Sequence, residues 1–104
     1  MAIQPRRMTE QIYNDINAER ERQNKKWGLQ THSFYKWMAI INEEMGEVCE
    51  EILEADAAMK NGVASLAEQH EANMREELVQ VAACVVAFLE QLERKELTHS
   101  EAVV

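Results

Sequence analysis

Three glutamates of one segment stand at a spacing that suits a metal site on a helix. The segment Glu43-Glu44-Met45-Gly46-Glu47 lies between the apolar pairs 40–41 and 48–49. Residues three and four positions apart share one side of an α-helix, so all three carboxylates lie within about a turn of one another. Like charges so close repel, and more strongly where water is excluded. A divalent cation among them would relieve that repulsion.

A second polar stripe follows later in the chain. Glu77, Gln80 and Cys84 occupy offsets 0, 3 and 7 and border an apolar run. A buried polar group without a partner costs about 1–3 kcal/mol, so Glu77 and Gln80 need partners. If the two helices pack antiparallel, Glu77 can face the glutamate cluster. Mg²⁺ prefers oxygen ligands and keeps waters that a substrate's phosphates can replace.

The competing interpretation is a solvated acidic face, which is what acidic runs on helices usually are. We interpret Glu50, Glu51 and Glu54 in this way. The cluster at 43–47 fits that interpretation less well, because three glutamates cannot all avoid the packed side of an apolar-rich helix. Periodicity alone leaves both interpretations open.

The elements that must position these residues are helices. Only three glycines and one proline interrupt the chain, and good helix formers dominate. The pattern predicts helices over about 9–25, 33–60 and 65–95. Trp27-Gly28 breaks the first, Thr31 or Ser33 caps the second, and Asn61-Gly62 ends it. Ser65-Leu66-Ala67-Glu68 is a capping box for the third.

The fold class is therefore all-α, with residues 1–104 as a single domain whose ends, 1–8 and 96–104, we expect to be flexible. The stretch 78–89 is apolar nearly all round. Two partner helices barely cover such a helix, so we expect a homodimer or homotetramer to complete the bundle. Phe34 and Trp37, at helical spacing, are predicted core residues.

Composition excludes several classes of protein. The net charge of −8 disfavours binding to a nucleic-acid polymer, which needs a basic surface. No apolar run approaches the ~20 residues of a membrane span, and the N-terminus does not resemble a secretory signal. Cys49 and Cys84 form neither a disulfide framework nor a zinc site. We expect both to be buried thiols in a reducing cytoplasm.

At the glutamate cluster the chain resembles the MazG-like, all-α nucleoside triphosphate pyrophosphohydrolases. That family carries a Glu-Glu-x-x-Glu helix followed by a Glu-x-x-Asp helix. The first motif is complete here, and the second reads Glu77-Leu78-Val79-Gln80. Lys26-Trp27-Gly28 and His32 also look like the upstream segment of small members. The resemblance covers roughly residues 15–92, and its motifs are short.

The resemblance implies hydrolysis of a ribo- or deoxyribonucleoside triphosphate between the α and β phosphates, giving a monophosphate and pyrophosphate. It implies Mg²⁺, with Mn²⁺ as a possible substitute, held by Glu44, Glu47 and Glu77. Glu43 or Glu44 would orient and deprotonate the attacking water. Glu43 could equally be a ligand, and these roles stay open.

Gln80 departs from the family pattern, which has Asp. Its amide oxygen can ligate a metal but brings no charge. Either the chain is an active variant with a weaker ligand, or it is a decayed, non-enzymatic nucleotide-binding or protein-interaction module. Lys26, Trp27 and Lys36 are candidate substrate contacts, through base stacking or phosphate binding. The alternative is an indole that fastens the loop and two solvated lysines.

Overall fold

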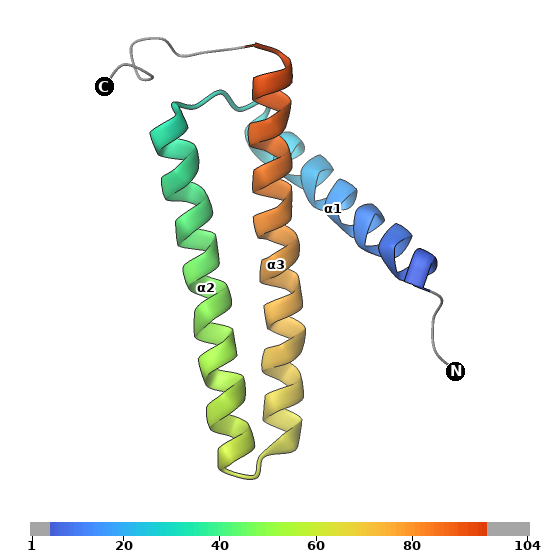
Figure 1. The fold of residues 1–104 in the computed structure, drawn as a ribbon, viewed down its shortest axis with the longest axis vertical. Helices are drawn as coiled ribbons and strands as arrows, with labels where there is room; N and C mark the ends of the chain where they lie inside the picture. Colours follow the sequence, from blue (N-terminus) through green and yellow to red (C-terminus); the bar gives the residue numbers. More distant parts are fainter. Residues whose placement is uncertain (1–4, 96–104) are drawn as a thin grey trace.

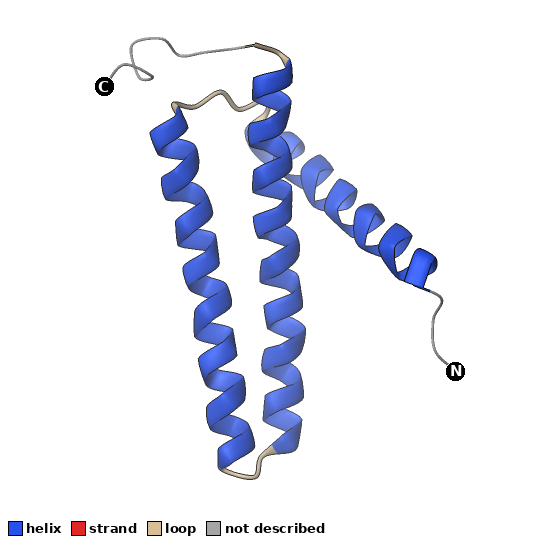
Figure 2. Cartoon of the chain, viewed as in Figure 1, coloured by secondary structure: helices blue, strands red, loops and turns tan. Residues whose placement is uncertain are grey.

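The computed structural model describes residues 5–95, which form three α-helices and no strand. They are α1 (Pro5–Trp27), α2 (Phe34–Lys60) and α3 (Ala64–Glu93). Figure 2 shows helix throughout the described residues, apart from the two connections between helices and the turn that follows α3. The all-α prediction is confirmed.

The core of the fold is an antiparallel hairpin. α2 and α3 run side by side over most of their length, and α1 crosses α3 obliquely and diverges from it toward its own N-terminus (Figure 1). Two ion pairs tie α1 to α3. Arg20 Nη2 lies 2.6 Å from Glu90 Oε1, and Arg75 Nη2 lies 2.7 Å from Asp15 Oδ2. These two ion pairs hold α1 against α3 and so fix the position of α1 relative to the hairpin.

The first helix begins at Pro5, earlier than predicted, so residues 5–8 are helical; residues 1–4 lie outside the described part of the chain. Proline suits the first position of a helix, because its fixed φ is helical and its missing N–H has no helical partner there. The helix ends at Trp27. Gly28 follows with φ +71° and donates its N–H to Asn24 O at 2.8 Å, as the break predicted at this dipeptide requires.

The second helix begins and ends as the sequence predicts. Ser33 is its N-cap, and its hydroxyl accepts the Lys36 N–H at 3.1 Å. At the other end Gly62 has φ +74° and donates to Met59 O, while Val63 N–H donates to Ala58 O at 2.9 Å. This pair of hydrogen bonds is a Schellman motif, which turns the chain directly into α3.

The predicted capping box at Ser65 is wrong. α3 starts at Ala64, its N-cap is Val63, and no side chain caps it. Val63 is the last residue of the Schellman turn and also the first flanking residue of α3, so the helix is under way before Ser65. The helix ends at Glu93, and the predicted tail 96–104 lies outside the described residues.

One end of the hairpin is fixed by Trp37 and Gln91, the two largest fully buried side chains. The Trp37 ring stacks on Phe88 with centroids 5.5 Å apart, and its Nε1–H donates to Gln91 Oε1 at 2.6 Å. The same oxygen accepts the His32 N–H, and Gln91 Nε2 donates to His32 O. A single amide therefore anchors the α1–α2 loop to α3, and the predicted core role of Trp37 is confirmed.

The rest of the core is thin. Among the described residues, five of the eight buried apolar residues are alanines, which bring the helix backbones close together but contribute little apolar area. Cys84 is buried as predicted, whereas the prediction of a buried Cys49 is wrong, because that thiol is exposed on α2.

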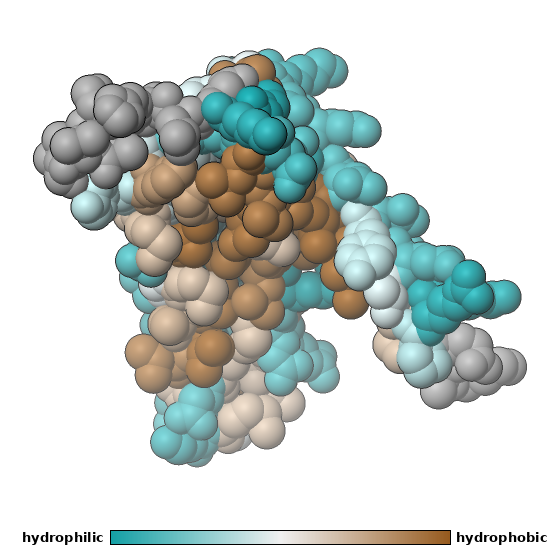
Figure 3. Space-filling view, turned by 45° about the horizontal axis from the view of Figure 1, so that its top comes forward, coloured by the Kyte–Doolittle hydropathy of each residue, from teal (hydrophilic) through white to brown (hydrophobic). Residues whose placement is uncertain are grey.

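Large apolar side chains remain exposed along one face of the hairpin, which we call the apolar face. On α2 they recur every seven residues, at Met38, Met45, Ile52 and Met59; on α3 they are Leu78, Val85, Leu89 and Leu92. Figure 3 shows hydrophobic side chains gathered over α2 and α3 beside the point where α1 departs. Within residues 5–95, no helix is long and apolar enough to cross a membrane.

Candidate functional site

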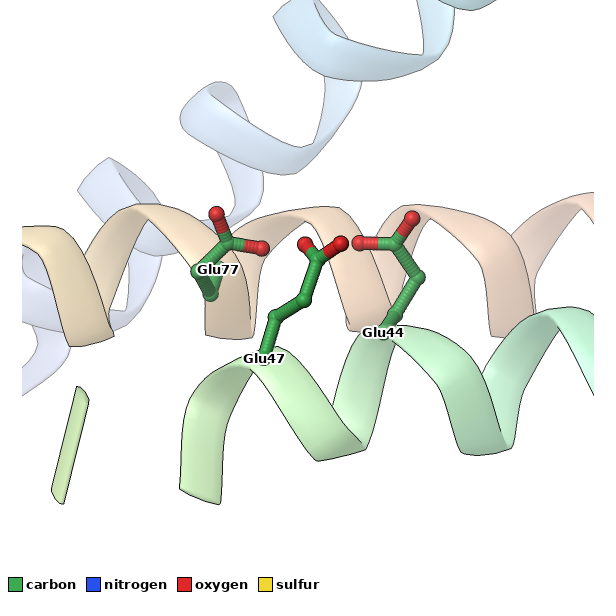
Figure 4. Close-up of side chains that lie close together, drawn as sticks. All are labelled: Glu44, Glu47 and Glu77. Carbon is green, nitrogen blue, oxygen red and sulfur yellow. The ribbon is translucent and has the colours of Figure 1, made fainter. Parts of the chain in front are cut away.

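The antiparallel hairpin brings three predicted metal ligands together. Glu44 and Glu47 come from adjacent turns of α2, and Glu77 comes from the facing turn of α3. One carboxylate oxygen of each lies within 4.8 Å of the other two. Figure 4 shows the three carboxyl groups on the same side of the hairpin, pointing toward the space that α1 crosses. We call these three residues the carboxylate cluster.

The electrostatics of the cluster favour the binding of a cation. Burial, a hydrogen-bond contact with Glu47 and the nearby negative charges raise the pKa of Glu77 to about 7. Burial, then the charges of Glu47 and Glu43, also raise the pKa of Glu44, and Arg22 opposes this. Glu44 Oε2 and Glu77 Oε2 are buried without a hydrogen-bond partner. Two oxygens that have lost water and gained no donor fit the ligand set of a hard cation.

Glu43 and Gln80 lie beside the cluster. Glu43 is exposed and outside the group of three, although its charge acts on Glu44. Gln80 is half-buried one turn beyond Glu77 and lines a cavity together with Glu44. The Gln80 side chain therefore lies near the cluster.

Two cavities open between α1 and the hairpin, next to the cluster. The smaller, of about 230 Å³, is lined in part by Trp27, Trp37 and Glu44. The larger, of about 460 Å³, lies between α1 and α3 and is lined in part by Arg75. Glu19, Arg22 and Gln80 line both cavities. The two therefore adjoin along one groove past the cluster, which we call the α1 groove.

The three predicted substrate contacts are placed differently. Trp27 lines the smaller cavity with about half of its surface exposed, and Lys26 Nζ lies 4.7 Å from its ring centroid. Lys36 is exposed in the first turn of α2 and lines neither cavity of the groove. Of the three, the structure thus brings only Trp27 to the wall of the groove.

The side chains that α1 contributes to the groove were not predicted from the sequence. Glu19 is mostly buried, Gln23 is buried, and Arg22 reaches the groove. The signal was present, because Ile12, Ile16, Glu19 and Gln23 continue one helical stripe at steps of three and four. Polar residues on the inner stripe of a helix mark a polar interior.

Glu51 also departs from its predicted solvated role. Its Oε2 lies 2.6 Å from His70 Nδ1 and accepts a longer hydrogen bond from Asn73 Nδ2. All three side chains are partly buried between α2 and α3. A Cβ at Gly46, beside the cluster, would meet nothing within 4 Å.

Comparisons with protein-family models, curated proteins and solved structures give no match to this chain.

Proposed function

We propose that this protein is a Mg²⁺-dependent nucleotide pyrophosphohydrolase, which cleaves a nucleoside triphosphate between the α and β phosphates. The observation that carries the proposal is the convergence of Glu44, Glu47 and Glu77 from two helices, with two of their oxygens buried and unpartnered. The adjoining α1 groove supplies space for a ligand at the same place. The motif resemblance of the two helices supports the same reaction.

The donor set suits the metal. Three carboxylates supply hard anionic oxygens, and Gln80 can add a neutral one, directly or through a water. Bound Mg²⁺ supplies neutralisation of phosphate charge and polarisation of the attacked phosphorus. Mn²⁺ accepts the same ligands.

The chain's own residues supply the remaining roles. Glu43 is exposed beside the cluster, so its carboxylate is free to orient a water molecule and accept its proton. Glu44 is the alternative base, because burial and the charge of Glu47 raise its pKa above the usual value of a glutamate. The wall of the groove keeps the nucleotide beside these carboxylates.

Gln80 motivates the rival proposal of a decayed, non-enzymatic module. A pyrophosphate-release assay over the ribo- and deoxyribonucleoside triphosphates, with Mg²⁺ or Mn²⁺ and an EDTA control, separates the two. We expect EDTA-sensitive release by the wild type and none by Glu44→Gln. Release by Gln80→Asp alone would mean a decayed site on an intact fold. No pyrophosphate release by either the wild type or Gln80→Asp would favour the non-enzymatic binding module.

We further propose that a second copy of the chain covers the apolar face. Its side chains recur every seven residues on α2 and at steps of seven, four and three on α3, which is the pattern of half a four-helix bundle. Residues 78–89 contain no Asp, Glu, Lys, Arg or His, so the partner surface must also be apolar. A second copy brings an identical face, related by a two-fold axis.

Light scattering coupled to size exclusion tests this interface. We expect a mass of at least twice the 12.0 kDa of one chain, and dissociation in Leu89→Glu. Leu53→Glu is the matched control, because Leu53 is more exposed still but is not part of the apolar face. A monomeric wild type, or equal behaviour of the two variants, would contradict the proposed dimer.

A further inference from the structure

The larger cavity of the α1 groove carries features that the carboxylate cluster does not explain. It lies between α1 and α3, and an arginine stands on each wall, Arg22 from α1 and Arg75 from α3. Each guanidinium is held by one carboxylate of α1. Arg22 donates from Nε and Nη2 to Glu19 at 2.8 and 2.6 Å, and Arg75 donates from Nη2 to Asp15 at 2.7 Å.

These contacts leave donors free. Arg22 uses one edge of its guanidinium on Glu19, and within residues 5–95 its Nη1 has no hydrogen-bond partner. Arg75 likewise keeps Nε and Nη1 without partners in the described chain. A guanidinium fixed by a carboxylate on one side and free on the other is suited to bind phosphate oxygens.

Arg22 also lies next to the carboxylate cluster. The charge of Glu44 acts on it, and it lines both cavities together with Gln80. Arg22 therefore lies where the two cavities adjoin, and Arg75 lines only the larger one. The cavity also holds the carboxylates Asp15, Glu19 and Glu76, so its own charge does not favour an anion. Binding of an anion here would need a divalent cation at the cluster.

We propose that the larger cavity is the binding site for inorganic pyrophosphate or the terminal phosphates of a nucleotide, with Arg22 and Arg75 as their ligands. This inference rests on the proposed function, since it requires Mg²⁺ at the carboxylate cluster. In this proposal, Arg22 contacts the phosphate group beside the carboxylate cluster, and Arg75 contacts the phosphate group farther from it.

The test uses inorganic pyrophosphate and Mg²⁺ as probes, with calorimetry and thermal unfolding of the full chain. We expect pyrophosphate to bind the wild type only with Mg²⁺ present. Arg22→Ala should weaken this binding at least tenfold, and Arg22→Lys should weaken it less, because it keeps the charge. Arg6→Ala is the control, since Arg6 is an exposed α1 residue that pairs with Glu10 and does not line the cavity.

Arg75 needs a second control, because its ion pair with Asp15 also ties α1 to α3. Asp15→Asn breaks that tie and keeps the arginine. We expect Arg75→Ala to lose pyrophosphate affinity severalfold, whereas Asp15→Asn retains it. If Asp15→Asn loses as much affinity as Arg75→Ala, the arginine acts only through the ion pair and its role as a phosphate ligand is overturned.

The outcomes separate this inference from the proposed function. If Mg²⁺ alone stabilises the wild type but pyrophosphate does not bind, or binds Arg22→Ala as tightly, the phosphate site is overturned and the metal site stands. If Mg²⁺ itself has no effect on the wild type and nucleotides are not hydrolysed, the proposed function fails, and the phosphate site fails with it.

Discussion

Replacing Glu77 with Gln tests the electrostatic account of the carboxylate cluster. Glu77 has a pKa raised from 4.5 to about 7, chiefly by burial and by Glu47. The folded protein therefore binds this proton more tightly than the unfolded chain does. The stabilisation is fully present below about pH 4.5 and is lost as the pH rises through about 7.

The size of the effect follows from the size of the pKa change. Each pKa unit corresponds to about 1.4 kcal/mol, which gives an upper bound of roughly 3 kcal/mol. Solvent reaches part of the cluster and screens it, so we expect about 1–3 kcal/mol. Glu77→Gln mimics the protonated carboxyl and should remove this loss. In metal-free protein the variant is expected to become more stable than the wild type above pH 7.

The assay is urea unfolding in EDTA at pH 5 and pH 8, with Glu76→Gln as the matched control. Glu76 is the exposed neighbour of Glu77 and lies outside the cluster. If the difference between Glu77→Gln and the wild type is the same at both pH values, the account of this cluster is refuted.

Adding Mg²⁺ should reverse the order of stability. A ligand that binds only the folded state stabilises it by about 2.7 kcal/mol at 100 times its dissociation constant. The wild type should gain this stabilisation, and Glu77→Gln should lose most of it because a ligand is missing. Equal gains in both proteins would remove Glu77 from the metal site.

Three further predictions concern the fold and are read by chemical or thermal denaturation. Gly62→Ala should destabilise the folded protein by about 1 kcal/mol, because Gly62 has a φ of +74°. Gly46→Ala should stabilise it by about 0.5–1 kcal/mol, because a Cβ at this helical position is unobstructed. The reverse order of stabilities would contradict the left-handed turn at Gly62. Ser33→Ala should cost about 0.5–2 kcal/mol and Ser65→Ala almost nothing, because only Ser33 caps a helix. Gln91→Ala should cost about 2–4 kcal/mol, since it leaves a cavity and the Trp37 indole unpaired, and an unchanged midpoint would show that the loop does not depend on this amide.

The sequence by itself determined the three helices, two of their turns and the stripe on which each carboxylate lies. These features are local, because a helix places residues three and four apart on one side whatever it packs against. The pairing of Glu44 and Glu47 followed from spacing alone. Their approach to Glu77 followed only on the assumption of an antiparallel hairpin, which the structure bears out.

Only the tertiary structure decided what surrounds the carboxylates. The inward turn of Glu19, Arg22 and Gln23 depends on where α1 crosses α3, which ion pairs distant in sequence fix. The start of α3 at Ala64 depends on the turn before it rather than on its own capping signal. Burial, and the pKa of Glu77 with it, comes from helices that approach from elsewhere in the chain, and no local pattern encodes that distance.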